Sequence, residues 1–250
     1  MRRLLRALPV VLLVVCGSIA VGATPANASC TPHCYARALW PVNAPSGFEG
    51  GKANIRTNCI TIYHIDDFIT NEMWVASSND AKAYWVEGGI HQGIRYDGDY
   101  TDYTHPHFFW AQNSPSVNNG AHGHFIAYYF SSGPVLGNAY NLDIYENTPG
   151  GGNWTVYING NFGASSNNYH GPARAIAAGT EVQTEPGEGG ADVYSGTSAM
   201  SWYDLGGVLH SDWQASTQTG DDIEPSKPPM VYDWPVMFTW LHHGMVVTCP

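Results

Sequence analysis

Short stretches of alternating apolar and polar residues, separated by turn-forming residues, recur along most of this chain. The clearest is NLDIYENTPGGGNWTVYING, residues 141–160, where Leu142 and Ile144 face one way on a first strand and Trp154 and Val156 do so on a second. A proline and three glycines between them supply the unusual backbone dihedral angles that a chain reversal needs. This pattern predicts a β-hairpin.

The rest of the chain carries the same pattern, and no sustained 3.6-residue periodicity is present. Further strands are expected at residues 59–65, 71–77, 82–90, 107–112, 123–130, 173–183 and 235–240. The stretch 184–229 is rich in Gly, Ser, Thr, Asp and Pro, and we expect loops with a few short strands there. The sequence therefore predicts an all-β fold with little helix, an antiparallel β-sandwich or jelly roll.

The first 28 residues have the three parts of a secretory signal peptide. Three arginines among the first six residues are followed by a short apolar stretch, and residues 26–28, Ala-Asn-Ala, fit the small-x-small cleavage pattern. The apolar stretch is too short to be a convincing membrane span. We expect cleavage after Ala28, secretion to the extracellular space, and a single β-sandwich domain over residues 29–250.

The charge balance restricts the partners. Loss of the three signal-peptide arginines leaves 7 Lys and Arg against 21 Asp and Glu, so the formal net charge falls from −11 to −14. Nucleic acids and anionic membranes bind basic surfaces, so we expect neither as a partner. The balance suits a soluble secreted protein, which we expect to be a monomer.

Four cysteines follow the signal peptide: Cys30, Cys34, Cys59 and Cys249. An even number in an exported chain predicts two disulfides, although three pairings are possible. A disulfide between the N-terminal segment 29–70 and Cys249 would hold the two ends of the domain together. A zinc site is the competing interpretation, but CxxxC with two remote cysteines is poor zinc spacing.

Two glutamates lie in strand-like segments of aromatic, apolar or small residues. Alternation places Glu87 on one strand face with Trp85, and Glu181 on one strand face with Gln183. Each glutamate could be a solvated residue on a wet sheet face, or an acid held in a cleft for catalysis.

Two such acids would be sufficient for hydrolysis of a peptide or glycosidic bond without a metal. If folding brings Glu87 and Glu181 together, mutual repulsion raises one pKa and leaves one acid protonated and one ionised. The ionised group can take a proton from water, and the protonated group can donate to the oxygen that develops charge. The expected substrate-contacting neighbours are Trp85, His91, Gln92 and Gln183.

Three histidine pairs raise the possibility of a metal site: His105 and His107, His122 and His124, and His242 and His243. The first two pairs could each share a strand face. No HExxH motif accompanies them, so we expect surface or hydrogen-bonded histidines, with no metal and no cofactor. A serine-nucleophile elbow is not evident at YSGTSAM either.

Aromatic residues favour an alternative function, a non-enzymatic, lectin-like carbohydrate-binding β-sandwich. The candidate platform residues are Trp85, Trp110, Tyr128, Tyr129, Trp154 and Tyr157. Alternation also predicts that many of them are core residues.

Several motifs follow one another between about residues 71 and 183: NEMWV and AYWVEGGI, HFFWAQ, GHFIAYYF, NWTVYINGNFGASS and ARAIAAGTEVQTEPG. In this order they resemble the neprosin family of secreted β-sandwich glutamic peptidases. One catalytic glutamate of that family is followed by a small residue and glycine, as in WVEGGI at Glu87. The second lies in a Gly-Gly-Glu-Val type of motif, which AGTEV resembles at Glu181, with Thr180 where a glycine is common.

The resemblance implies an acid-active endopeptidase that acts on peptides or proteins and cleaves after proline. The plant enzymes of the family carry an activation domain before the catalytic domain. Here only about forty residues, 29–70, would precede the matched part, too few for an independent core, so we do not expect a zymogen mechanism.

Overall fold

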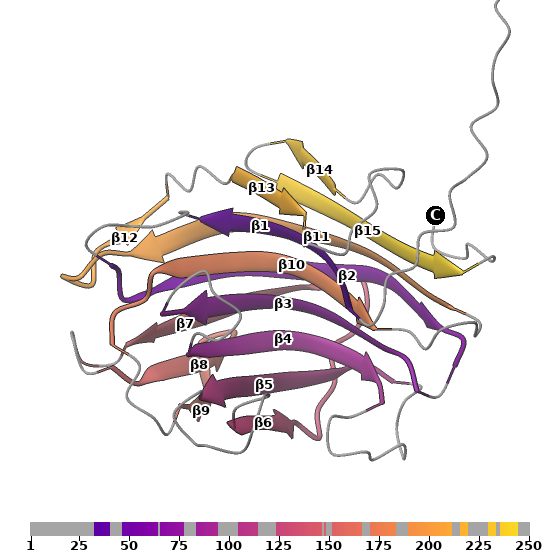
Figure 1. Ribbon diagram of the computed structural model, residues 1–250, viewed down its shortest axis with the longest axis horizontal. Coiled ribbons are helices and arrows are strands. Elements are labelled where there is room, and N and C mark those ends of the chain that lie inside the picture. Colours follow the sequence, from indigo (N-terminus) through magenta and orange to yellow (C-terminus); the bar gives the residue numbers. More distant parts are fainter. Residues whose placement is uncertain are drawn as a thin grey trace, which may run out of the picture.

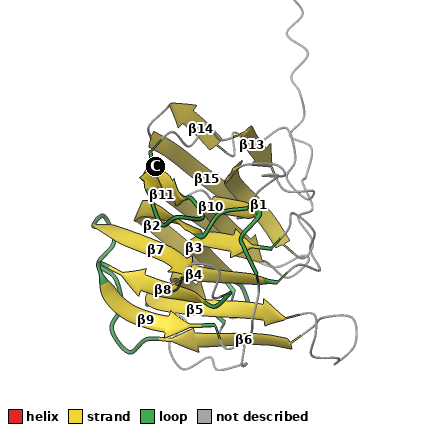
Figure 2. Ribbon diagram, turned by 90° about the vertical axis from the view of Figure 1, so that its left-hand side faces the viewer, coloured by secondary structure: helices red, strands yellow, loops and turns green. Residues whose placement is uncertain are grey.

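The computed structural model describes residues 33–40, 47–64, 66–77, 84–94, 105–114, 124–146, 148, 152–166, 171–183, 190–211, 216–219, 230–233 and 236–244. Within these ranges the chain consists of strands and their connections, without a helix (Figure 2). In the same ranges no helix is long and apolar enough to cross a membrane. The expected signal peptide lies outside the described residues, so secretion remains a prediction.

Seven strands form one sheet in the order β13-β1-β10-β3-β4-β5-β6, and Figure 1 looks onto this sheet. Its strands are β1 (His33–Trp40), β3 (Phe68–Ala76), β4 (Trp85–Gly93), β5 (His107–Ser114), β6 (His124–Tyr129), β10 (Ala175–Gln183) and β13 (Ser216–Thr219). Every neighbouring pair is antiparallel.

Eight strands form the second sheet, in the order β14-β15-β11-β2-β7-β8-β9, with the short β12 paired to β11. Its strands are β2 (Gly50–Ile62), β7 (Ala139–Glu146), β8 (Trp154–Ile158), β9 (Asn161–Ser165), β11 (Gly190–Tyr203), β12 (Leu209–His210), β14 (Met230–Asp233) and β15 (Val236–Gly244). These pairs are antiparallel as well. The predicted all-β, antiparallel sandwich is therefore confirmed.

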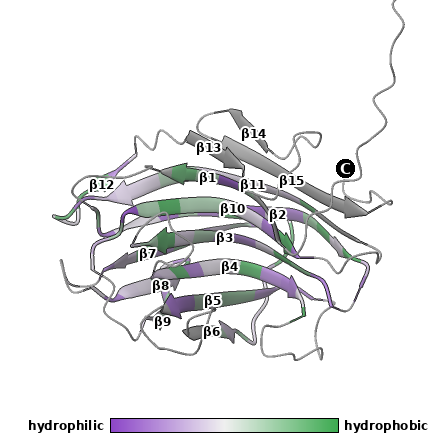
Figure 3. Ribbon diagram, in the orientation of Figure 1, coloured by the Kyte–Doolittle hydropathy of each residue, from purple (hydrophilic) through white to green (hydrophobic). Residues whose placement is uncertain are grey.

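The core lies between the two sheets and follows the alternation in the sequence. Met73 of β3 and Val86 of β4 belong to the same buried cluster as Leu142 and Ile144 of β7 and Val156 of β8. Both hydrophobic and hydrophilic residues are present along these central strands (Figure 3). Because successive side chains of a strand point to opposite faces, the residues next to these core positions point away from the other sheet.

The predicted hairpin is confirmed as the antiparallel pair of β7 and β8. The expectation for residues 184–229 was wrong for β11, which has 14 residues and lies between β15 and β2. Its small polar residues read as loop, yet Ser195 and Thr197 are buried in the sheet. In such a position the strand's backbone groups are satisfied by two neighbouring strands, which composition does not reveal.

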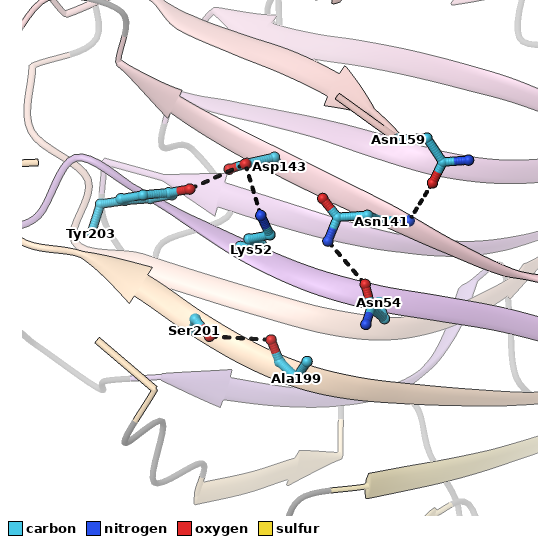
Figure 4. A network of polar contacts seen from close by, with 8 residues as sticks. All are labelled: Lys52, Asn54, Asn141, Asp143, Asn159, Ala199, Ser201 and Tyr203. Carbon is cyan, nitrogen blue, oxygen red and sulfur yellow. Dashed lines mark hydrogen bonds and ion pairs between the residues drawn. The ribbon is translucent and has the colours of Figure 1, made fainter. Parts of the chain in front are cut away.

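The outer face of the eight-stranded sheet carries a compensated polar network (Figure 4). Lys52 Nζ lies 3.6 Å from Asp143 Oδ2, and the Tyr203 hydroxyl donates a hydrogen bond of 3.1 Å to the same oxygen. Nearby, the Asn141 amide donates to the side-chain oxygen of Asn54 at 2.9 Å. This face is polar, and each of these side chains has a partner of opposite charge or a hydrogen-bonding partner.

Candidate active site

Glu87 and Glu181 lie on the same face of the seven-stranded sheet, the one turned away from the core. On β4, Val86 belongs to the core, so the next residue, Glu87, points outward. On β10, Val182 packs toward the second sheet in a smaller buried cluster, so Glu181 points outward too. The structure therefore brings both predicted acids to one face.

A third glutamate, Glu72, lies between them on β3, the strand that separates β10 from β4. Trp74 of β3 lies opposite Glu87, and Thr70 lies opposite Glu181. Glu72 lies midway between Thr70 and Trp74, on the same face, so it is a diagonal neighbour of both predicted acids. Glu72 is not among the residues that the sequence patterns predicted for the site.

All three carboxyl groups are largely removed from solvent. The exposed fraction is 7% for Glu87, 8% for Glu181 and 0% for Glu72. Burying an ionised carboxylate is costly unless it is paired or hydrogen-bonded, so three such acids cannot all be charged together. The cluster must therefore hold protons.

Hydrogen bonds reach the cluster from neighbouring side chains and link two of the acids. The Thr70 hydroxyl donates a hydrogen bond of 2.6 Å to Glu72 Oε1. The side chain of Trp74 hydrogen-bonds the Glu87 carboxyl, and Glu72 and Glu181 share a side-chain hydrogen bond.

These surroundings change the acidity of two of the three groups. Burial raises the pKa of Glu87 well above its ordinary value, and the charge of Glu181 raises it further, against the lowering effect of the Trp74 hydrogen bond. Burial also raises the pKa of Glu72, with further increases from the charges of Glu87 and Glu181. Glu181 thus raises the pKa of both neighbouring glutamates.

The groups that act on the pKa of Asp143 differ from those that act on the glutamate cluster. Burial raises the pKa of Asp143 too, but the charge of Lys52 and the hydrogen bond of Tyr203 both act to lower it. The groups that act on the pKa of Glu72 and Glu87 are instead other carboxyls and neutral donors. Asp143 thus has a cation and a hydroxyl donor that stabilise its charged form. In the cluster, burial and the neighbouring carboxyls favour the protonated forms of Glu72 and Glu87.

Two glycines flank Glu72 across the sheet, Gly179 on β10 and Gly89 on β4. A Cβ atom at Gly89 would lie 2.7 Å from both Cα and Cβ of Glu72. The neighbouring Gly88 points the other way, where a Cβ would lie 2.7 Å from Cγ1 of Val156 in the second sheet. Each glycine of the Gly88-Gly89 pair thus allows a close approach on its own side of β4.

Three of the four predicted neighbours lie on the face of the acids: Trp85, His91 and Gln183. Gln92 does not, because it follows His91 on β4 and lies opposite Ile69, which belongs to an inward-facing cluster. Its predicted substrate contact is therefore not supported by its position. Successive residues of a strand point to opposite faces, so Gln92 points away from the face that His91 shares with the acids.

Three aromatic rings surround His91, which lies in the same cross-strand row as Glu181. Its ring centroid lies 5.6 Å from that of Phe68, 5.7 Å from that of Phe109 and 4.8 Å from that of Tyr129. Thr70 lies between Glu181 and His91 in the same cross-strand row. His91 and Phe109 are buried, so Phe68 and Tyr129, which are half-buried, are the rings of this group that an apolar or aromatic substrate group could reach.

The six aromatic residues proposed as a carbohydrate platform do not share a face. Trp110 and Trp154 belong to the core cluster between the sheets, and Tyr157 stacks on Tyr145 in the second sheet. Trp85 and Tyr129 lie on the face of the acids. As a single binding platform this set is wrong, because alternation distributes its members over different layers.

The other sequence predictions are only partly reached by the described residues. Cys59 on β2 is disulfide-bonded, while the side chains of Cys30, Cys34 and Cys249 lie outside the described residues, so the pairing stays a prediction.

Of the histidine pairs, only His105 and His107 have described side chains, and His107 Nδ1 lies 3.2 Å from the Phe130 carbonyl oxygen. The side chains of His122, His124, His242 and His243 lie outside the described residues. In the described part of the chain no three His, Cys, Asp or Glu side chains are grouped so that they could hold a metal ion.

No protein-family model and no curated protein sequence matches the chain. Among solved structures, it is similar to scytalido-glutamic peptidase with a transition-state analogue inhibitor, at 12% identity and TM-score 0.48, over 85% of this chain and 98% of that one. SCP-B of the eqolisin family, in complex with the tripeptide Ala-Ile-His, is similar at 10% identity and TM-score 0.46, over 86% of this chain and 98% of that one.

A Bacteroides ovatus GH16 protein of a mixed-linkage glucan PUL, in complex with its product, is also similar. The identity is 13% and the TM-score 0.42, over 61% of this chain and 66% of that one. At these values the likenesses carry no conclusion about activity, which has to be argued from the three glutamates.

Proposed function

We propose that this protein is a secreted, monomeric, acid-acting endopeptidase of glutamic-peptidase type, with Glu87 and Glu181 as its catalytic dyad. The observation that supports it best is the placement of a buried Glu87, whose pKa is raised, on the same sheet face as Glu181. One acid that keeps its proton beside another that is ionised is the combination that general acid–base hydrolysis requires. Their order in the chain and the neprosin-like motifs around them support the same function.

In the proposed reaction, a peptide lies across the outer face of the seven-stranded sheet with its scissile carbonyl between the two partly exposed acids. Glu181 takes a proton from a water molecule, whose oxygen attacks the carbonyl carbon. Glu87 donates its proton to the carbonyl oxygen as charge develops there. When the intermediate collapses, the C–N bond breaks and the proton held by Glu181 goes to the leaving amine. Glu87 recovers its proton from one hydroxyl group of the intermediate, whose oxygen becomes the carbonyl oxygen of the acid product.

The preference for cleavage after proline is part of the proposal and rests on the neprosin resemblance. Phe68 and Tyr129, the two half-buried rings beside the buried His91, are an apolar surface on which a proline ring could pack.

The test is a peptide-library digest between about pH 3 and pH 8, with Glu87→Gln and Glu181→Gln as controls. We expect endoproteolytic cleavage on the acid side, enriched after proline, and none from either variant. Full activity in either variant would overturn the dyad, and cleavage without enrichment after proline would overturn the specificity alone. Mass measurement of the exported protein, expected to begin at Ser29, tests secretion and signal cleavage.

A further inference from the structure

Glu72 has no place in the proposed reaction, although it lies at the centre of the acid cluster. It is the diagonal neighbour of Glu181 on one side and of Glu87 on the other. Its exposed fraction is 0%, whereas the two dyad residues keep some exposure. A peptide on the sheet surface would therefore meet Glu87 and Glu181, and Glu72 would act on it only through them.

The hydrogen bonds of Glu72 bear on whether its carboxyl group is protonated. Its Oε1 accepts the hydrogen bond from the Thr70 hydroxyl at 2.6 Å. Its Oε2 is buried, and among the described residues no N–H or O–H donor reaches it. The Glu72 side chain also shares a hydrogen bond with the Glu181 carboxyl. Two carboxyl groups can share a hydrogen bond only if one of them is protonated, and the fully buried Glu72 is the one from which solvation of a charge is most completely removed.

The charged and titratable groups around Glu72 favour the same assignment. Glu181 faces it from β10, Glu87 and His91 from β4, and Arg37 of β1 lies one strand beyond β10 in the same row. The Arg37 guanidinium lies over the Trp74 ring, 5.8 Å from its centroid. Burial raises the pKa of Glu72, and the charges of its two diagonal neighbours, Glu87 and Glu181, raise it further.

The backbone around Glu72 leaves room for this arrangement. The two residues directly opposite it, Gly179 and Gly89, have no side chains. A Cβ atom at Gly89 would lie 2.7 Å from Cα and Cβ of Glu72, whereas a Cβ atom at Gly179 would meet the backbone of Ala36 and Arg37 on β1. Gly89 therefore allows β4 to approach β3 closely beside Glu72.

We infer that Glu72 is a positioning residue that keeps its proton throughout the reaction and donates it in a hydrogen bond to Glu181. The cluster then carries one negative charge, on Glu181, and this charge is oriented toward the water it activates. This inference rests on the proposed function for its catalytic meaning. The proton on Glu72 can be tested without any activity.

Two substitutions separate the hydrogen bond from the acidity. Glu72→Gln keeps an acceptor for Thr70 and an N–H donor for Glu181, but it cannot ionise. Glu72→Met has similar length and offers neither. Glu49→Gln is the matched control, because Glu49 is also buried with a raised pKa but lies outside the cluster, near Glu146 and Asp204.

In kinetics, we expect Glu72→Gln to stay within about tenfold of the wild-type kcat/KM and Glu72→Met to lose about 100-fold or more. We also expect the acid limb of the pH profile to move to higher pH in Glu72→Met, since the Glu181 carboxylate loses a stabilising donor. If Glu72→Gln is as inactive as Glu87→Gln, Glu72 is itself catalytic and the inference fails. Wild-type rates and pH profiles in both variants would overturn it as well.

The second readout is the carboxyl carbon-13 resonance of Glu72, assigned by its loss in Glu72→Gln. We expect this resonance to titrate at higher pH than those of exposed glutamates, and co-titration with them would overturn the inference. If the wild-type protein cleaves no peptide at any pH, the proposed function fails, and the titration alone decides whether Glu72 holds the proton. Circular dichroism and thermal unfolding of each variant verify that it is folded.

Discussion

Glu87 and Glu181 lie on the two strands that flank β3 and point to the same face of one sheet, with Glu72 midway between them. No two of the three glutamates are on the same strand. The proton affinity of each carboxyl therefore depends on the pairing of β10, β3 and β4 as much as on its own surroundings.

The first prediction concerns the dyad. Glu87→Gln and Glu181→Gln should each lower kcat/KM for acid-pH peptide cleavage by at least about 100-fold, because each removes one side of the proton transfer. Steady-state kinetics on a peptide selected from the library digest measure this loss. Glu49→Gln removes a buried acid elsewhere and should keep nearly wild-type activity. A loss in Glu49→Gln equal to that in the dyad variants would mean that the effect is on folding.

The second prediction concerns stability against pH. The pKa values of Glu72, Glu87, Glu49 and Asp143 are all raised in the folded protein. Between the ordinary carboxyl pKa and the raised values, the folded state binds more protons than the unfolded state, so the free energy of unfolding falls as pH rises. Below the ordinary pKa the contribution is fully present.

Thermal unfolding followed from about pH 4 to about pH 7 should therefore show a Tm that decreases with pH. The decrease should be smaller in Glu72→Gln, which has one fewer raised carboxyl. A Tm that increases steadily over this range would contradict the assigned pKa directions.

A third prediction concerns Trp74, whose hydrogen bond lowers the pKa of Glu87. Trp74→Phe keeps an aromatic ring and removes the indole N–H, so the pKa of Glu87 should rise further. If Glu87 is the proton donor, the alkaline limb of the pH–rate profile should move to higher pH. Trp202→Phe, on the second sheet, is the control and should leave the profile unchanged. A shift to lower pH in Trp74→Phe would be incompatible with Glu87 as the donor.

The fourth prediction separates the two glycines of WVEGGI. In Gly88→Ala the new methyl group meets a side-chain atom, Cγ1 of Val156, at 2.7 Å, whereas in Gly89→Ala it meets the backbone oxygen of Asn71 at 2.2 Å. Both changes should destabilise, each by about 1–3 kcal/mol or more, as overpacking of a core does. Only the clash in Gly88→Ala can be relieved by a smaller side chain at the contacting residue, Val156, because the clash in Gly89→Ala is with backbone atoms.

A double-mutant cycle in urea should therefore show that Val156→Ala offsets part of the cost of Gly88→Ala, with a coupling of about 1 kcal/mol. The same cycle with Gly89→Ala should show no coupling. Equal coupling in both cycles would mean that the two glycines do not face opposite sides of β4.

Glu87 and Glu181 could be predicted from the sequence because each interrupts an apolar or small-residue strand, and alternation gives the face. Glu72 was missed because the predicted strand began at Asn71, so Glu72 resembled a polar strand end. The structure begins β3 at Phe68, which places Thr70 and Glu72 inside the strand. The meeting of the three acids depends on register between strands that are remote in sequence, and no local pattern encodes that register.

The same reasoning applies to β11. Its Ser195 and Thr197 have the composition of a loop, and only the pairing with β2 and β15 makes them buried strand residues.

The place of β10 in its sheet has a consequence for the order of folding. Glu72 and Glu87 lie on β3 and β4, which are consecutive in the chain and adjacent in the sheet. Glu181 follows 94 residues after Glu87 and reaches them only when β10 takes its place between β1 and β3. Such long-range pairing is slow relative to local contacts. We therefore expect Glu181, the proposed water-activating carboxylate, to be among the last groups to reach its place, so that a nascent or partly folded chain would have no assembled dyad with which to cleave itself or its neighbours.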